Sequence, residues 1–248
     1  MPSKKTRTQL PAPDPSAHPV PSVSEKNGVL TMHFQAEYVQ SQMLSADPGF
    51  LTLAYARNMM AFEQLTPDAR SIALIGLGGG GLAKWIHRHH PRAKITVVEI
   101  NPHVIALRDR FHIPPDSRRF RILCADGIDF VVEQAKDLDV LLVDGFDLDS
   151  VPDALCSVYF YSACYRALSA NGLLVVNLCG YNRRIAQARL RRIFAGRILS
   201  ARDKNGNTVV YACKGDLLWP KNATGTFLSQ ARIAFEKKHA LARALKPI

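Results

Sequence analysis

The chain has 248 residues, 47% of them hydrophobic, and a formal net charge of +11. This length favours one principal domain with a large core and leaves little room for a second full domain. No apolar stretch approaches the roughly 20 residues that cross a bilayer, which excludes a membrane-spanning helix, and we expect a soluble, cytoplasmic protein.

Residues 1–27 are rich in Pro, Ser and Lys and poor in apolar side chains, so we expect a disordered basic tail there. Residues 28–70 begin with a short alternating stretch and continue into a helical pattern over 48–65. This region predicts a short N-terminal cap segment in front of the main fold.

From Ser71 onward, apolar strand-like runs alternate regularly with helix-like segments, over 71–215. The predicted strands are 72–76, 95–100, 121–125, 140–144 and 173–178, and the predicted helices are 82–90, 102–111, 128–134 and 154–168. Such alternation predicts an α/β fold with a doubly wound, mostly parallel sheet that is covered on both faces. Two later runs, 198–201 and 208–213, flank an Asn-Gly turn and predict an antiparallel finish to the sheet.

The C-terminal quarter is strongly basic. Residues 183–248 carry fifteen Lys or Arg and only three Asp or Glu, and we expect a basic helix over 216–248. Solvated helix faces are the favoured interpretation of this charge. The alternative is a docking surface for nucleic acid or an acidic protein partner.

The first predicted strand runs directly into a glycine-rich turn, GLGGGG, which is followed by a helix. Gly76, Gly78, Gly79 and Gly80 let the backbone turn tightly and approach a ligand, while free N–H groups at a helix start favour electron-rich atoms. Glu99 ends the next strand, where it can accept hydrogen bonds from the two hydroxyls of a ribose. Enzymes that bind NAD-type dinucleotides share this opening, so these residues alone leave both ligands open.

Acidic residues also follow the third and fourth predicted strands. Asp126, with Gly127 after it, can accept a hydrogen bond from the exocyclic amine of adenine, whereas an acid there would repel a pyrophosphate. This favours a nucleoside of the S-adenosylmethionine type over a dinucleotide. After the fourth strand, Asp144 and Asp147 can hold or deprotonate an amine nucleophile.

Histidines and cysteines do not form a recognisable metal site. His87, His89 and His90 have no carboxylate or cysteine companion at ligand spacing, and the five cysteines are widely spaced without a CxxC pair. We therefore expect no metal and no disulfide framework, which fits a reducing compartment.

Four successive motifs, LIGLGGGG, VVEI, ADGIDF and DVLLVDGFD, together resemble those of spermidine synthases over roughly residues 28–178. The resemblance implies a class I methyltransferase-like, Rossmann-like fold. It also implies Glu99 on the ribose, Asp126 at the adenine, and Asp144 with Asp147 at the amine, where Asp147 matches the catalytic base of that family. Gln40 and Tyr55 look similar to a Gln and a Tyr that the family's N-terminal segment lends to the substrate site.

Two departures from the family pattern matter for the choice of donor. The family's glycine turn contains an aspartate that grips the amino group of decarboxylated S-adenosylmethionine and would repel the carboxylate of the intact donor, and Gly79 stands in its place. The acid that usually follows the site tyrosine is also missing, since Ala56 follows Tyr55. In addition, the N-terminal β-domain through which many family members dimerise is much reduced, which leaves a homodimer open.

We therefore expect a transferase that uses decarboxylated S-adenosylmethionine or S-adenosylmethionine as co-substrate and a small-molecule amine as acceptor. The first interpretation is transfer of an aminopropyl group to a polyamine such as putrescine. Two alternatives remain: an S-adenosylmethionine-dependent methyltransferase, and an inactive nucleoside-binding scaffold whose basic surface docks an acidic partner.

Overall fold

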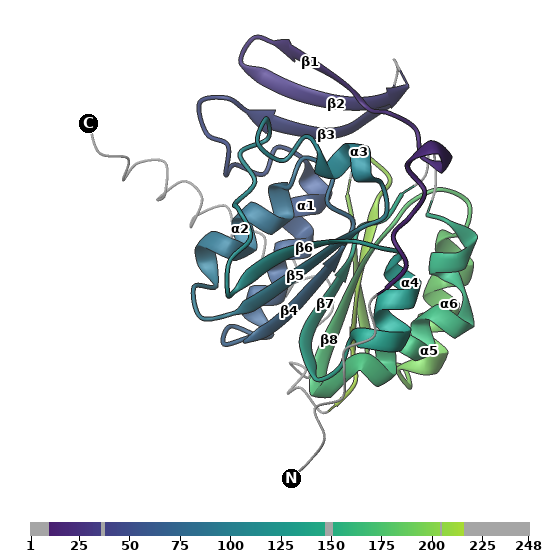
Figure 1. Ribbon diagram of the computed structural model, residues 1–248. Helices are drawn as coiled ribbons and strands as arrows, with labels where there is room; N and C mark the ends of the chain where they lie inside the picture. The colour runs from purple at the N-terminus through teal and green to yellow at the C-terminus, as the bar shows by residue number, and fades with distance from the viewer. Residues whose placement is uncertain (1–9, 36–37, 147–150, 204, 216–248) are drawn as a thin grey trace.

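The computed structural model describes residues 10–35, 38–146, 151–203 and 205–215, which form two separate sheets (Figure 1). Asp147 and the predicted C-terminal helix over 216–248 lie outside these residues. No helix of the described part combines the length and the apolar character needed to cross a membrane.

The larger sheet has seven strands in the order β6-β5-β4-β7-β8-β10-β9. Their bounds are β4 Ser71–Ile75, β5 Lys94–Glu99, β6 Phe120–Cys124, β7 Leu138–Val143, β8 Leu168–Leu178, β9 Ile198–Arg202 and β10 Thr208–Cys213. The first five are parallel, while β10 pairs antiparallel with both β8 and β9. The structure thus confirms the predicted mixed sheet, including its antiparallel finish.

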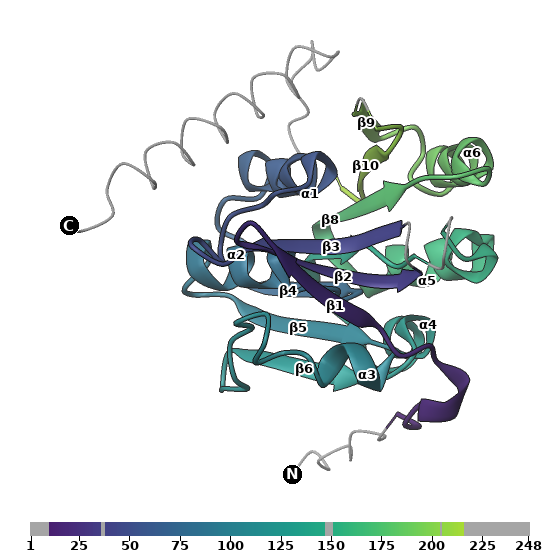
Figure 2. The same cartoon turned by 90° about the horizontal axis from the view of Figure 1, so that it is seen from above.

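Helices cover both faces of this sheet, as Figures 1 and 2 show. They are α1 Ala54–Met59, α2 Gly81–His89, α3 Pro102–Ile105, α4 Gly127–Asp129, α5 Val158–Ala167 and α6 Arg183–Ile193, with the short turns η1 Pro15–Ala17, η2 Met60–Gln64, η3 Phe130–Gln134 and η4 Asp153–Cys156. Alternate residues of each strand point to opposite faces of the sheet, and each face has its own hydrophobic core. Ile72 and Leu74 pack on the side of α1 and α2, whereas Ala73 and Ile75 pack on the side of α5 and α6.

The smaller sheet consists of the antiparallel strands β1 Ser22–Lys26, β2 Val29–Gln35 and β3 Tyr38–Leu44. This differs from the disordered tail expected for residues 1–27, because β1 lies within that range. Its side chains are mostly exposed, with only Val23 packed against a core, so composition gave no sign of order. The strand is held instead by its backbone ladder with β2.

Several helices are shorter than expected. α3 ends at Ile105, where the pattern predicted a helix to residue 111, and α1 with η2 covers only part of the 48–65 pattern. Hydrogen-bonded turns follow both elements. They keep apolar residues at roughly helical spacing although no regular helix continues there.

Candidate active site

A cavity of about 770 Å³ lies at the carboxyl edge of the parallel strands, between the two sheets. Gly76 follows β4, Glu99 ends β5 and Asp144 follows β7, and all three line the cavity. The strand order reverses between β4 and β7, and crevices at such switch points are the usual ligand sites of parallel α/β sheets. Strands β2 and β3 close the opposite side of the cavity through Met32 and Gln40.

The glycine turn passes close to the end of β7. Gly76 has a φ of +93°, and a Cβ there would overlap the backbone carbonyl of Asp144. Gly80 has a φ of +69°, and a Cβ there would overlap the side chain of Ile113. Only glycine satisfies both conditions at these two positions, so the turn can lie flat against its neighbours and lead into α2.

Gly79, the residue that replaces an expected acid, contacts β3. Its backbone N–H donates a 2.9 Å hydrogen bond to Ser41 Oγ. A Cβ at Gly79 would lie 2.7 Å from that oxygen and 2.8 Å from Cδ1 of Phe111. A side chain therefore does not fit here unless Ser41 and Phe111 move.

Glu99 is buried and binds the loops on both sides of it. Oε2 accepts a hydrogen bond of 2.8 Å from the N–H of Leu77, and Oε1 accepts one of 2.9 Å from the N–H of Asn101. Burial raises the pKa of this carboxyl, while the backbone donors lower it. These backbone donors belong to Leu77, Gly78, Ile100 and Asn101, and a carboxylate has about four acceptor positions, so a ligand hydroxyl would share an oxygen of Glu99 with one of them.

Asp144 is the acid at the other end of the cavity. Asn177 Nδ2 donates a hydrogen bond of 3.0 Å to Oδ1, and the hydroxyl of Tyr55 donates to the same carboxylate. Burial raises the pKa of Asp144 to about 6, although both hydrogen bonds act in the opposite direction. Burial and the charge of Asp144 raise the pKa of Tyr55, so Tyr55 remains a donor at neutral pH.

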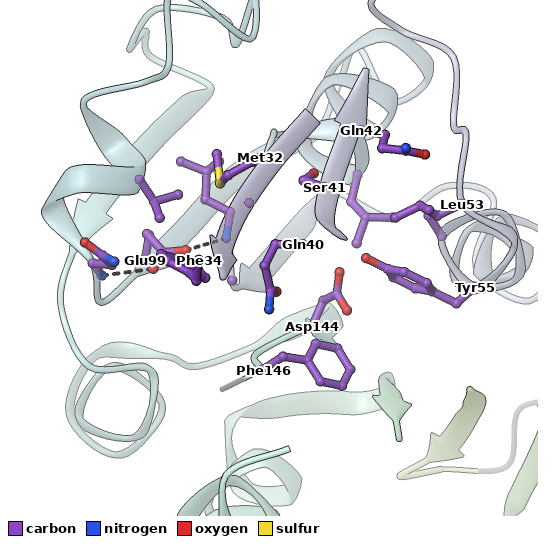
Figure 3. Close-up of a pocket in the computed structure, with 18 of the residues that line it drawn as sticks. Met32, Phe34, Gln40, Ser41, Gln42, Leu53, Tyr55, Glu99, Asp144 and Phe146 are labelled. Carbon is purple, nitrogen blue, oxygen red and sulfur yellow. Dashed lines mark hydrogen bonds between the residues drawn. The ribbon is translucent and has the colours of Figure 1, made fainter. Parts of the chain in front are cut away.

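The cavity has two chemically different ends. Figure 3 shows Gln40, Tyr55 and Phe146 around Asp144, while Glu99 lies at the far end beside Phe34. Tyr181, 78% exposed, also lines the cavity. One end thus offers an acid for hydroxyl groups, and the other an acid among amide and aromatic side chains.

The N-terminal segment crosses the rim of the cavity at the Glu99 end. Asn101 Nδ2 donates a hydrogen bond of 2.8 Å to the carbonyl of Pro19, and His103 Nε2 lies 3.2 Å from the carbonyl of Pro15. His18 and Pro19 line the cavity as a result.

The structure brings together most of the residues that the sequence singled out. Gly76, Gly78, Gln40, Tyr55, Glu99 and Asp144 all line the cavity. Among the described residues, Gly79, Gly80, Asp126 and Gly127 are outside the lining. Asp126 is the N-cap of α4, where Oδ1 accepts a hydrogen bond of 2.6 Å from Ile128 N–H.

Sequence reasoning missed several residues of this site. Asn177 positions Asp144, and its signal was a lone amide inside an apolar strand. Ser41, Phe146 and Tyr181 carried no recognisable pattern, because their place depends on how distant segments meet.

Comparison of the amino-acid sequence with those of known proteins identifies relatives of this chain. Residues 52–185 match the spermine/spermidine synthase domain. The polyamine aminopropyltransferase of Neisseria meningitidis serogroup A is 37% identical over 206 residues, which are 81% of this chain and 78% of that protein. The polyamine aminopropyltransferase of Chromobacterium violaceum is 38% identical over 204 residues, with the same two shares.

Solved structures share the fold at lower sequence identity. A probable spermidine synthase from Corynebacterium glutamicum superposes with a TM-score of 0.73 at 17% identity and covers 85% of this chain and 82% of its own. Human methyltransferase-like protein 13, solved with SAH, gives 0.63 at 21% identity, covering 79% and 94%. A spermidine synthase solved with the transition state analogue AdoDATO gives 0.58 at 20% identity, covering 75% and 66%. The sheet is thus that of class I methyltransferase-like enzymes.

Proposed function

The chain belongs to the spermine/spermidine synthase family, and we propose that it transfers an aminopropyl group from decarboxylated S-adenosylmethionine to a polyamine such as putrescine. The observation that carries this proposal is the cavity with Glu99 at one end and Asp144, with a pKa of about 6, at the other. Its volume suits a nucleoside together with a short amine.

The donor is assigned to the Glu99 end. Glu99 would accept hydrogen bonds from the ribose hydroxyls, and Gly76 and Gly78 would let the backbone approach the ligand closely. Asp126 Oδ1 caps α4 through Ile128, and Oδ2 is the oxygen that would accept from the adenine amine, so its role stays a prediction.

The amine acceptor is assigned to the Asp144 end. A protonated amine is attracted to this carboxylate, and Gln40 and Tyr55 beside it would fix the direction of the chain. An amine attacks carbon only as the free base. Asp144, and Asp147 as the base predicted from the sequence, are therefore the groups that would take its proton.

The transfer itself is a displacement at carbon. The nitrogen lone pair forms a bond to the methylene carbon attached to the sulfonium, and the carbon–sulfur bond breaks with its electrons going to sulfur. The products are the extended polyamine and neutral 5′-methylthioadenosine, and the proton lost by nitrogen passes to a carboxylate. Proximity of the two bound substrates supplies much of the rate.

Methyl transfer from the intact donor is the second candidate, and Gly79 favours it. Without an acid at this position, the carboxylate of intact S-adenosylmethionine meets no fixed negative charge on the turn. The contact between Gly79 and Ser41 places a neutral hydroxyl there instead.

Product identification separates the two reactions. The protein is incubated with putrescine and either decarboxylated or intact S-adenosylmethionine, and products are followed by mass spectrometry. Spermidine and 5′-methylthioadenosine from the decarboxylated donor support aminopropyl transfer. S-adenosylhomocysteine from the intact donor, with no spermidine from the other, contradicts it.

Asp147→Asn tests the predicted base. We expect the variant to lose turnover while donor affinity, measured by calorimetry, stays nearly unchanged, because the residue is assigned to the amine and not to the nucleoside. Retained turnover would refute the role of Asp147 as base.

A further inference from the structure

A second cavity, of about 420 Å³, lies at the opposite edge of the large sheet. It is lined by the amino ends of β4, β5 and β6, through Ser71, Lys94 and Arg121, and by the segment that enters β7. Two of these strands, β4 and β5, carry the candidate active site at their carboxyl ends. The two cavities are therefore separated by the length of the strands.

This cavity exists because one helix is short. The helical segment α4–η3 ends at Gln134, and residues 135–137 lead directly into β7. The segment covers the sheet near its middle and leaves the face that bears Lys94 and Thr96 open at its amino end. Phe130 and Leu138, both buried, supply apolar surface beside this opening.

The lining is strongly positive. Five cationic side chains and one acid belong to it: Lys94, Arg118, Arg119, Arg121, Lys136 and Asp137. Within the described part of the chain, Lys94, Arg118 and Lys136 are exposed and form no ion pair. Two neighbouring carboxylates are engaged elsewhere, since Asp116 pairs with Arg108 and Asp139 accepts the backbone N–H groups of residues 70 and 71, which leaves Asp137 as the acid of the lining against five cations.

Two of the arginines are held in place by the fold. Arg121 Nε donates a hydrogen bond of 3.1 Å to Thr96 Oγ1 on the neighbouring strand. Arg119 Nη2 donates one of 2.9 Å to the carbonyl of His87, and its Nη1 is buried with no hydrogen-bond partner among the described residues. Arg119 is thus tied to the end of α2, while Arg121 is the guanidinium that the fold fixes beside Thr96 in the cavity lining.

We propose that this cavity binds a small phosphate-bearing anion with two or three linked phosphates, such as inorganic tripolyphosphate or a nucleoside triphosphate. Guanidinium groups fixed in direction, with lysines at the rim, are the side chains that recognise phosphate oxygens. The cavity volume lies in the range of small-molecule sites, and the apolar surface of Phe130 can carry an organic group. The site is independent of the donor cavity and of the proposed transfer reaction.

Calorimetric titration of the full chain with inorganic tripolyphosphate, and separately with uridine triphosphate, tests the proposal. Adenine nucleotides are avoided because the active-site cavity is proposed to accept adenosine. The double variant Lys94→Gln/Lys136→Gln removes two rim charges. Lys26→Gln/Arg184→Gln removes the same charge from exposed positions outside the cavity and serves as the matched control.

We expect saturable binding with one site per chain at about 50 mM salt, where screening is weak. Affinity should fall about tenfold, or about 1.4 kcal/mol, in the cavity variant and less than twofold in the control. Tighter binding of uridine triphosphate than of tripolyphosphate would show that the cavity prefers a nucleotide. The reverse order would show that it prefers the inorganic anion.

Three results would overturn the proposal. They are no binding of either probe, an equal loss of affinity in both double variants, and binding of single-stranded RNA that depends on Lys94 while both small probes fail. Donor binding measured on the same variants should not change, which separates this test from that of the transferase.

Discussion

The hydroxyl of Tyr55 on α1 donates a hydrogen bond to the carboxylate of Asp144 at the end of β7, so the cap segment and the central sheet meet at the acid of the candidate active site (Figure 3). Tyr55 is partly buried and packs against the core that α1 shares with the sheet. The contact therefore sets both the direction and the proton affinity of Asp144.

Tyr55→Phe removes this donor and keeps the ring. We expect the KM for putrescine to rise by about ten- to a hundredfold, because a hydrogen bond to a charged group contributes about 1.5 to 3 kcal/mol and Asp144 is the group assigned to hold the amine. The pKa of Asp144 should also rise, since the lost bond favours the charged form. Steady-state kinetics over a range of pH measure both effects, and unchanged values would show that the contact does not matter for the acceptor.

Protonation of Asp144 should lower the rate of transfer to the amine at acidic pH. With a pKa of about 6, its carboxylate form is present above that pH and is lost as the pH falls through it. We expect kcat/KM for the amine to decline below about pH 6 by one proton, and Asp144→Asn to remove this decline and lower the rate across the whole range. A decline that persists in the Asn variant would have to be assigned to another group.

The contact between Gly79 and Ser41 predicts a stability effect. Gly79→Ala should lower the free energy of unfolding by about 1 to 3 kcal/mol, because the new Cβ meets Ser41 Oγ and Phe111 in a packed region. Ser41→Gly/Gly79→Ala should recover part of that loss, since one of the two obstacles is gone. Urea unfolding of both variants measures the difference, and full stability of the single variant would contradict the packing argument.

Lys84, which is 8% exposed, predicts an unusual dependence of stability on pH. Its Nζ donates a hydrogen bond of 2.7 Å to the carbonyl of Phe111, and burial lowers its pKa from 10.5 to about 8. The unfolded chain keeps this proton up to about pH 10.5 whereas the folded chain releases it near pH 8, so the unfolded state binds more protons between these values. This residue should therefore make the protein more stable as the pH rises from 8 to 10.5.

Lys84→Met should remove that contribution, which amounts to at most about 3 kcal/mol over the window. The measurement is urea unfolding at several pH values, compared with the wild-type protein. Lys26→Met, at an exposed position of β1, is the matched control and should retain the wild-type slope. Parallel curves for Lys84→Met and the wild type would show that the buried lysine does not titrate as stated.

The central sheet was predictable from sequence because its strands are continuous apolar runs. Leu74, Val97 and Leu142 belong to such runs, and burial on both faces is the only arrangement that removes them all from water. The positions of the glycine turn, Glu99 and Asp144 were predictable for a related reason, since parallel strands bring their carboxyl ends to one edge. Only the strand boundaries and helix lengths differed.

The remaining parts depend on contacts that a local pattern does not contain. Strand β1 is ordered by backbone pairing, to which its exposed polar side chains contribute little. Asp126 illustrates a competition between two uses of one residue, because an aspartate after a strand is also a favoured N-cap, and it caps α4 here. Ser41 and Asn177 became visible as site residues only when β3 and β8 were placed beside the cavity.

The crossing of the N-terminal segment over the cavity has a consequence for its tolerance to sequence change. Asn101 and His103 both reach main-chain oxygens, at Pro19 and Pro15, and neither contact reads a side chain. At these two points the N-terminal segment is therefore held through its main chain, whereas Leu10 is held by packing of its side chain against the core. The side chains at positions 15 and 19 can therefore change during evolution provided that the chain keeps its path, while Asn101 and His103 on the main fold cannot.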